Sequence, residues 1–161
     1  MKNNLLSKIL IAPNVISSDG VDFIINYAKK QDVLRDLSVF DPSKSNSTKS
    51  TKFTVDKEVR DTQMIDLEKI SGEIVDLYRN IVSNVINPFY EVEIKDSEIP
   101  QLLHYGIGGH YKAHCDGESL WKPPGNHPLI WRKSTDRDLS TVLFLNNDFE
   151  GGDFVFPELR I

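Results

Sequence analysis

Two side chains suited to metal binding, His114 and Asp116, lie two positions apart in the sequence His-Cys-Asp. If this stretch is an extended strand, both side chains leave the same face of it and Cys115 points the opposite way. A histidine nitrogen and a carboxylate oxygen held side by side supply two of the three ligands of the two-histidine, one-carboxylate triad, which binds Fe(II) and leaves coordination positions open. The pattern therefore predicts a metal site that a second histidine, distant in the sequence, must complete. The alternative for His114 and Asp116 is an ion pair or a surface strand that binds no metal.

The residues around this pair follow a recognisable order. Upstream of it are Tyr105, Gly108, Gly109 and Tyr111, and downstream are Arg137, the apolar stretch 140–146, the stretch 149–153 and the pair Phe156-Pro157. In this order the sequence resembles the 2-oxoglutarate- and Fe(II)-dependent dioxygenases, specifically their prolyl 4-hydroxylase-like branch. The resemblance is close over about the last third of the chain and looser over the helical part before it.

The resemblance implies an enzyme with a double-stranded β-helix (jelly-roll) core. It implies Fe(II) as the metal, held by His114 and Asp116 as the catalytic residues, with 2-oxoglutarate and O2 as cosubstrates and ascorbate as a further cofactor. The reaction would release succinate and CO2 and hydroxylate a C–H bond, and a proline in a peptide or protein is the first substrate to consider. Tyr105 stands where the family donates a hydroxyl to the 2-oxoglutarate carboxylate; the alternative is an aromatic side chain buried in the core.

Two features depart from the family pattern. The residue before Leu145-Asn146 is often a tyrosine that contacts the cosubstrate, but here it is Phe144, which has no hydrogen-bond donor. The family's distal histidine and the basic residue that pairs with 2-oxoglutarate follow the part that residues 153–157 match, where this sequence has only Arg160 as a basic residue. An incomplete β-helix is therefore expected: a fragment of a longer protein is preferred over completion by a second polypeptide or a degenerate relative.

Two other functions stay open. A non-catalytic jelly-roll binding module, or an inactive fragment without the distal histidine, would keep the scaffold and lack the chemistry. A zinc-dependent hydrolase would use local histidines, which share a face with the metal pair in an unbroken strand: His104, His110 and His114. The glycines at 108–109 are expected to break that strand, and His127 is expected to be an ordinary surface residue.

The elements that must position the site begin with two helices. Ser17 or Ser18 can cap a first helix, which places Val21, Ile24, Ile25 and Ala28 on one face. The strongest helical pattern runs from about Thr62 to Ser83 or beyond and stops before Pro88, because the residue before a proline disfavours helical dihedral angles. These helices are expected to support a sheet.

Strands are expected after the helices. Tyr90, Val92 and Ile94 alternate with charged residues, as in a strand with one buried face, and four more strands are predicted at 102–105, 111–116, 138–145 and 154–156. Helices followed by strands without regular alternation indicate an α+β fold with a mostly antiparallel sheet. We therefore predict a single domain over residues 1–161, with helical support over about 1–88 and the first half of the β-helix core over about 89–161.

Three segments are expected to be irregular. The stretch 41–52 has almost no apolar residue and is predicted to be a mobile loop. The connection from Asp116 to Asp136 carries Trp121 and Trp131 and would act either as a lid over the site or as a loop packed on the domain. Gly151-Gly152 is expected to give backbone freedom at a hairpin turn.

The composition fits a domain that is not built to bind nucleic acid. The net charge is −5 with a pI near 5.3, whereas affinity for phosphates requires clusters of basic residues. Cys115 is the only cysteine, which excludes an intrachain disulfide and favours a reducing compartment, so a cytoplasmic location is expected. Residues 1–11 are too short and too polar for a signal segment or a membrane span, and are expected to form the first strand.

Overall fold

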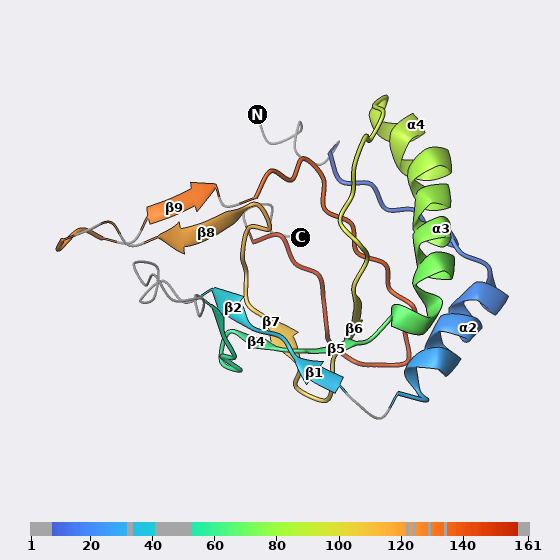
Figure 1. Cartoon of the computed structure of the whole chain (residues 1–161), viewed down its shortest axis with the longest axis horizontal. Helices are drawn as coiled ribbons and strands as arrows, with labels where there is room; N and C mark the ends of the chain where they lie inside the picture. The colour runs from blue at the N-terminus through green and yellow to red at the C-terminus, as the bar shows by residue number, and fades with distance from the viewer. Residues whose placement is uncertain are drawn as a thin grey trace. The chain divides into compact units, whose positions relative to one another are not determined.

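A computed structural model describes residues 8–31, 34–40, 53–121, 123, 125–128, 130–133 and 135–157 (Figure 1). Its secondary structure is mixed, with helices and short strands in small sheets, and this confirms the predicted α+β class. The chain divides into two compact units: unit 1 comprises the stretches 1–34 and 64–103, and unit 2 comprises 35–63 and 104–161. Each unit is described by itself.

Helix α2 of unit 1, Ser18–Ala28, confirms the first predicted helix. Ser17 is its N-cap, and the Ser17 hydroxyl oxygen accepts a hydrogen bond of 3.2 Å from the Gly20 amide. This bond satisfies one of the backbone donors that a helix leaves open in its first turn. Ile24 is buried on the inner face of the helix.

The second helical region is assembled from four pieces: η2 (Glu68–Ile70), α3 (Ser71–Ile81), the π-helical turn η3 (Val82–Ile86) and α4 (Asn87–Tyr90). The prediction that this helix starts at Thr62 is wrong, because residues Gln63–Ile65 form strand β5. The helical region starts later, where the Asp66 carboxylate accepts a hydrogen bond of 2.9 Å from the Glu68 amide.

The prediction that the helix stops before Pro88 is also wrong. Proline has no amide hydrogen, which costs nothing in the first turn of a helix because those amides lack helical partners anyway. The π-helical turn before it creates such a start, since the Asn87 amide donates to the Val82 carbonyl five residues back. Pro88 then lies in the first turn of α4.

The strand predicted at Tyr90–Ile94 is absent, because α4 includes Tyr90 and residues 91–100 form no strand. Glu91 ends the helix in the left-handed region with φ 55° and ψ 42°. The Val92 amide then donates to the Asn87 carbonyl at 3.1 Å, and the Ile94 amide to the Asn87 side-chain oxygen at 3.3 Å. Two amides of the alternating stretch therefore donate to Asn87 at the end of the helix. They are not available for the strand pairing that the sequence predicted.

The buried apolar core of the described residues lies in unit 1. Six apolar side chains are at most 9% exposed: Ile24, Ile65, Ile70, Ile74, Val82 and Ile86. In Figure 1, α2 (blue) lies beside the lower part of α3 (green), and Ile24 and Ile74 line a small apolar cavity together. None of the helices in the described ranges is both long and apolar enough to cross a bilayer.

The remaining strands are short. A three-stranded sheet has the order β1 (Leu34–Asp36), β5, β6 (Leu102–His104), and in unit 2 strand β2 (Val39–Phe40) pairs antiparallel with β3 (Phe53–Thr54). In the same unit β4 (Arg60–Asp61) pairs antiparallel with β7 (His110–Tyr111), so that Arg60 is opposite Tyr111 and Asp61 is opposite His110. This last pair leads directly into the His-Cys-Asp sequence.

The connection after Asp116 contains a β-hairpin, where the sequence predicted a loop. Strands β8 (Glu118–Trp121) and β9 (Ile130–Lys133) are antiparallel, with Trp121 opposite Ile130, and the hairpin appears in orange in Figure 1. At its base the Thr135 amide donates to the Gly117 carbonyl at 3.3 Å. The Trp131 side chain is 52% exposed, and the lid and the loop packed on the domain both stay predictions.

Residues 135–157 contain no strand, so the strands predicted at 138–145 and 154–156 are wrong. A strand needs hydrogen-bonded neighbours and cover for its apolar face, and here Val142 is 59% exposed and Phe144 56% exposed. Gly151 and Gly152 have φ of 72° and 68°, which confirms the predicted backbone freedom although no hairpin surrounds them. Residues 8–11 form no strand, while residues 1–7 and the predicted loop 41–52 lie outside the described residues.

Candidate metal-binding site

His114 and Asp116 face one another in unit 2. Strand β7 ends at Tyr111, and the chain bends at Ala113, so the continuous strand predicted over 111–116 is wrong. The bend nevertheless brings the His114 Nε2 atom to 3.0 Å from the Asp116 Oδ1 atom. The two side chains are 34% and 43% exposed, so solvent can reach the atoms that would bind an ion.

The separation of these two atoms is that of a hydrogen-bonded ion pair, and it also suits adjacent ligands of one metal ion. Two donors that each lie about 2.1 Å from an ion and are related by a right angle are about 3.0 Å apart. A neutral imidazole nitrogen and a carboxylate oxygen are also a donor set that Fe(II) accepts. The pair therefore fits two positions of the predicted triad.

The orientation of the His114 ring is set by two contacts. The Nδ1 atom is 2.8 Å from the Lys112 carbonyl oxygen, which only accepts, so Nδ1 carries a proton and donates it. The ring also stacks on Tyr111, with 3.6 Å between ring centroids and 22° between the planes. With Nδ1 engaged in this way, Nε2 is the nitrogen directed at Asp116.

The Asp116 carboxylate is held in its charged form. The hydrogen bond with the His114 ring lowers the pKa of Asp116 from its usual 3.8 to about 2, and a hydrogen bond with the Ser140 side chain and the charge of Arg137 act in the same direction. Arg137 Nη1 also donates to the backbone carbonyl of Asp116. Arg137 therefore both contacts the Asp116 backbone and adds positive charge beside the Asp116 carboxylate.

The His114–Asp116 contact is expected to stabilise the fold most between about pH 4 and pH 6.5. The depressed pKa of Asp116 gives stability that is present above 3.8 and lost as the pH falls toward 2. The hydrogen bond to Asp116 raises the pKa of His114 above 6.5, so its stability is present below 6.5 and lost as the pH rises through the raised value. Because the pair is more than one-third exposed, the effect is roughly 1 kcal/mol or less. Urea unfolding of the wild type and Asp116→Asn at several pH values measures it; a difference that does not vary with pH contradicts it.

Tyr105, the predicted cosubstrate contact, lies near Tyr111. It is 47% exposed, so the alternative of a buried core aromatic is wrong. Its hydroxyl is among the groups that raise the pKa of Tyr111, after the larger effect of burial. Tyr105, Tyr111 and the Asp116 carboxylate thus belong to one neighbourhood of unit 2.

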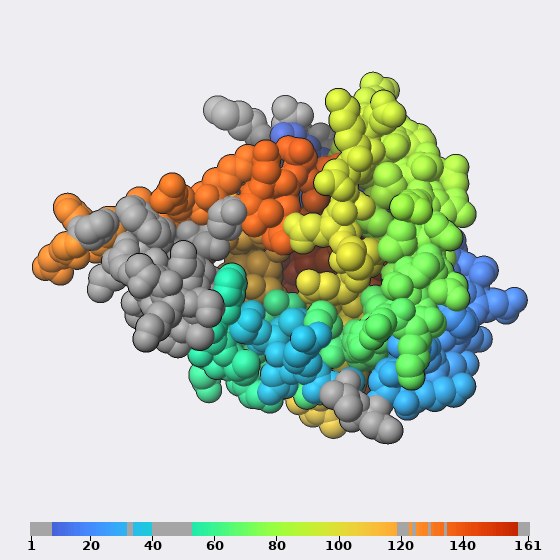
Figure 2. Space-filling model, viewed as in Figure 1, coloured from blue at the N-terminus to red at the C-terminus, as the bar shows by residue number. Residues whose placement is uncertain are grey.

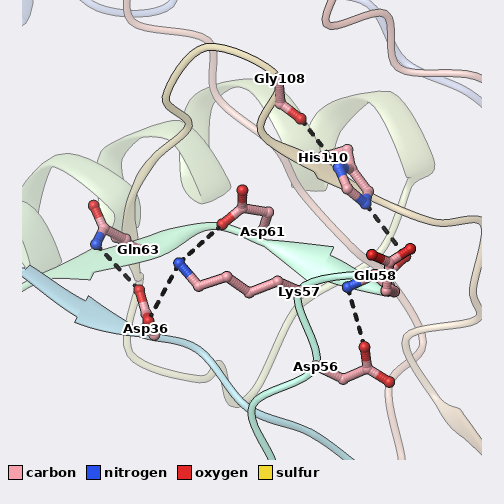
Figure 3. Close-up of polar contacts among 8 residues, drawn as sticks. All are labelled: Asp36, Asp56, Lys57, Glu58, Asp61, Gln63, Gly108 and His110. Carbon is pink, nitrogen blue, oxygen red and sulfur yellow. Dashed lines mark hydrogen bonds and ion pairs between the residues drawn. The ribbon is translucent and has the colours of Figure 1, made fainter.

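The other histidines do not join His114. His110 Nδ1 is 3.1 Å from the Gly108 carbonyl oxygen and its Nε2 is 3.3 Å from the Glu58 carbonyl oxygen (Figure 3). These two backbone acceptors raise the pKa of His110, since only the protonated ring donates from both nitrogens. Within the ranges that the structure describes, no three His, Cys, Asp or Glu side chains are grouped as a metal would need, so the local zinc cluster of His104, His110 and His114 does not form.

Lys57, in the turn before β4, forms ion pairs with one aspartate on β1 and one on β4. Lys57 Nζ lies 3.4 Å from a carboxylate oxygen of Asp36 and 3.4 Å from one of Asp61, and Gln63 donates to Asp36 (Figure 3). The carboxylates, Asp36 first, raise the pKa of Lys57. Lys57 is therefore a cation that contacts β4 through Asp61. Arg60 lies on the same strand.

Sequence reasoning missed two residues of this neighbourhood. Arg60 places its guanidinium carbon 4.5 Å from the centre of the Tyr111 ring, and Ser140 shares a hydrogen bond with Asp116. Arg60 is 51 residues before Tyr111 in the sequence, and only the β4–β7 register brings the two together. No local pattern in the sequence marks that pairing.

A groove among the described residues lies in unit 1. It measures about 590 Å³ and is lined by α3, η3 and the segment 93–100. In Figure 2 that segment (yellow) runs beside the helices (green). The groove includes none of the predicted site residues.

No protein-family model matches the chain, and no curated protein or solved structure matches it either. The function is therefore inferred from the geometry of His114 and Asp116 and from the order of residues around them.

Proposed function

We propose that the chain belongs to a 2-oxoglutarate- and Fe(II)-dependent oxygenase of the prolyl 4-hydroxylase-like kind, with His114 and Asp116 as two of the metal's ligands. The observation that supports this most directly is the 3.0 Å separation of His114 Nε2 and Asp116 Oδ1. A cytoplasmic location is part of the proposal, as is a jelly-roll core of which residues 89–161 supply the first half.

When bound, Fe(II) would supply the activation of O2 and couple the conversion of 2-oxoglutarate into succinate and CO2 to hydroxylation of a C–H bond. The residues of this chain prepare that site. Asp116 offers a charged oxygen at any pH well above about 2. The Lys112 carbonyl keeps a proton on His114 Nδ1, so Nε2, which donates to the Asp116 carboxylate in the metal-free protein, is the nitrogen that would bind the metal after losing its proton. Tyr105, half-exposed, is the proposed contact of the 2-oxoglutarate carboxylate, ascorbate would maintain the reduced metal, and a peptidyl proline is the proposed substrate.

The proposal requires a third protein ligand. The sequence has four histidines, all within the described ranges, and those ranges hold no group of three metal-binding side chains. The second histidine of the triad would therefore belong to a polypeptide segment other than these 161 residues. The binding of metal to this chain alone is accordingly expected to be weak.

The test uses Mn(II), which takes the place of Fe(II) without reacting with O2. Addition of MnCl2 to the chain is expected to broaden the His114 ring resonances in an NMR spectrum, because a paramagnetic ion relaxes nearby nuclei even when it binds weakly. The ring of His127, an exposed residue, is the internal control. In the longest polypeptide that contains these residues, 2-oxoglutarate is expected to strengthen Mn(II) binding. Equal broadening of both histidines contradicts the proposal.

A second candidate is a non-catalytic jelly-roll binding module. It is favoured by Phe144, which lacks a hydroxyl where the family commonly has one and is 56% exposed. It is also favoured because no third metal-binding side chain joins His114 and Asp116 among the described residues. The same experiment separates the two candidates. A binding module would take up neither Mn(II) nor 2-oxoglutarate in the longest polypeptide.

A further inference from the structure

We infer that Arg60 and Tyr111 are positioning residues that hold the His114 ring in its metal-binding orientation, as a three-layer stack of guanidinium, phenol and imidazole. This inference rests on the proposed function, since it gives His114 the role of a ligand. It gives Arg60 and Tyr111 a positioning role that the His-Cys-Asp sequence alone does not suggest.

The stack is built from the β4–β7 pair. Arg60 and Tyr111 are directly opposite in the antiparallel register, a position from which side chains on one face of a sheet contact each other. The guanidinium carbon of Arg60 lies 4.5 Å from the Tyr111 ring centre. The His114 ring lies 3.6 Å from the same centre, with 22° between the planes.

The two contacts must be on opposite faces of the phenol ring. At 3.6 Å the imidazole covers one face in van der Waals contact, so a guanidinium at 4.5 Å on that face would overlap it. The Tyr111 ring is therefore clamped between Arg60 and His114. A cation over the face of an aromatic ring is attracted by the ring's negative face, and this attraction limits tilting of the phenol ring.

The contact with Tyr111 fixes the orientation of the His114 ring, which the local backbone does not fix. Strand β7 ends at Tyr111, and His114 lies in an irregular bend without ladder hydrogen bonds to fix its side chain. The Lys112 carbonyl fixes the position of Nδ1, but the ring could still rotate about that hydrogen bond. Stacking on Tyr111 fixes the plane of the ring, and the two contacts together direct Nε2 toward Asp116.

Replacing Tyr111 with leucine is expected to weaken Mn(II) binding at His114 about 10-fold, in the range seen when partners that orient a metal ligand are removed. Tyr111→Phe retains the flat ring and is expected to bind Mn(II) like the wild type. In the metal-free protein, the His114 ring protons should show an upfield ring-current shift that is kept in Tyr111→Phe and lost in Tyr111→Leu. This shift reports stacking directly and does not depend on activity.

Arg60→Lys provides a second test that keeps the charge constant. Lysine lacks the planar guanidinium that stacks on an aromatic face, so Mn(II) binding is expected to weaken about 2- to 5-fold, the size of an exposed cation–π contact. Arg79→Lys is the matched control, because Arg79 is an exposed arginine paired with Asp76 on α3 of unit 1. It is expected to change nothing.

The outcomes separate the inference from the proposed function. If the wild type shows no selective broadening at His114, the proposed function fails and the ring-current shifts alone decide whether the stack exists. If the wild type binds Mn(II) and Tyr111→Leu binds it equally well, Tyr111 is not a positioning residue and the inference is overturned. Retention of the His114 shift in Tyr111→Leu would overturn it as well.

Discussion

Replacing His114 with alanine is expected to abolish the proposed activity, the Fe(II)-dependent conversion of 2-oxoglutarate to succinate by the longest polypeptide that contains these residues. The substitution removes one of the two donor atoms that lie 3.0 Å apart. Loss of a group that merely orients a ligand costs about 10- to 100-fold in affinity or activity, so loss of the ligand itself should exceed about 100-fold. Succinate release, measured with Fe(II), 2-oxoglutarate and O2, is the readout.

The matched control is His127→Ala. His127 is exposed and belongs to no metal-binding group of the described residues, so its removal should leave succinate release unchanged. Asp116→Ala should resemble His114→Ala. Succinate release that persists at the wild-type rate in His114→Ala would refute the assignment of this pair as metal ligands.

Replacing Gly109 with alanine is expected to destabilise the protein by about 2–3 kcal/mol, in the upper range for inserting a methyl group into filled space. A Cβ atom at this position would lie 2.9 Å from the Gly106 carbonyl oxygen and 3.1 Å from the Asp61 carbonyl oxygen. Both are backbone atoms, which cannot rotate away as a side chain can. Because Asp61 is paired with His110, relief of the clash would pull β4 from β7 and disturb the segment that carries His114.

Gly106→Ala, in the same loop, is the control for this prediction. A Cβ atom at Gly106 meets nothing within 4 Å, so a change within about 0.5 kcal/mol is expected. Urea unfolding measures both variants. Equal stability of Gly109→Ala and Gly106→Ala would mean that β4 and β7 do not pair in the register described here.

A structural feature could be predicted from the sequence when the residues that cause it lie close together in the sequence. The start of α2 was predictable because Ser17 satisfies an amide three residues away. The sequence correctly predicted that His114 and Asp116 lie close together, but for the wrong reason. A straight strand was expected, whereas the chain bends there and His114 Nδ1 donates to the Lys112 carbonyl. Side chains two positions apart meet in either geometry.

Other elements were mispredicted because distant or competing groups decide them. Pro88 is a normal helix breaker, yet the π-helical turn before it lets a new helix start. The alternating stretch after Tyr90 has a strand pattern, but the Asn87 oxygens take its amides first. The apolar stretch 138–145 also has a strand pattern, and pattern alone does not provide the neighbouring strand that would pair with it. Arg60 lies at the site because it pairs with Tyr111, which is 51 residues later in the sequence.

The hairpin β8–β9 is joined to the chain at the candidate site itself. Gly117, directly after Asp116, accepts the hydrogen bond from Thr135 that closes the hairpin base, and Arg137, just past that base, donates to the Asp116 carbonyl. The hairpin thus begins directly after Asp116, and Arg137, just after its last strand, bonds to the Asp116 backbone. Insertions near its tip at 125–128 are therefore expected to lengthen the hairpin without moving Asp116.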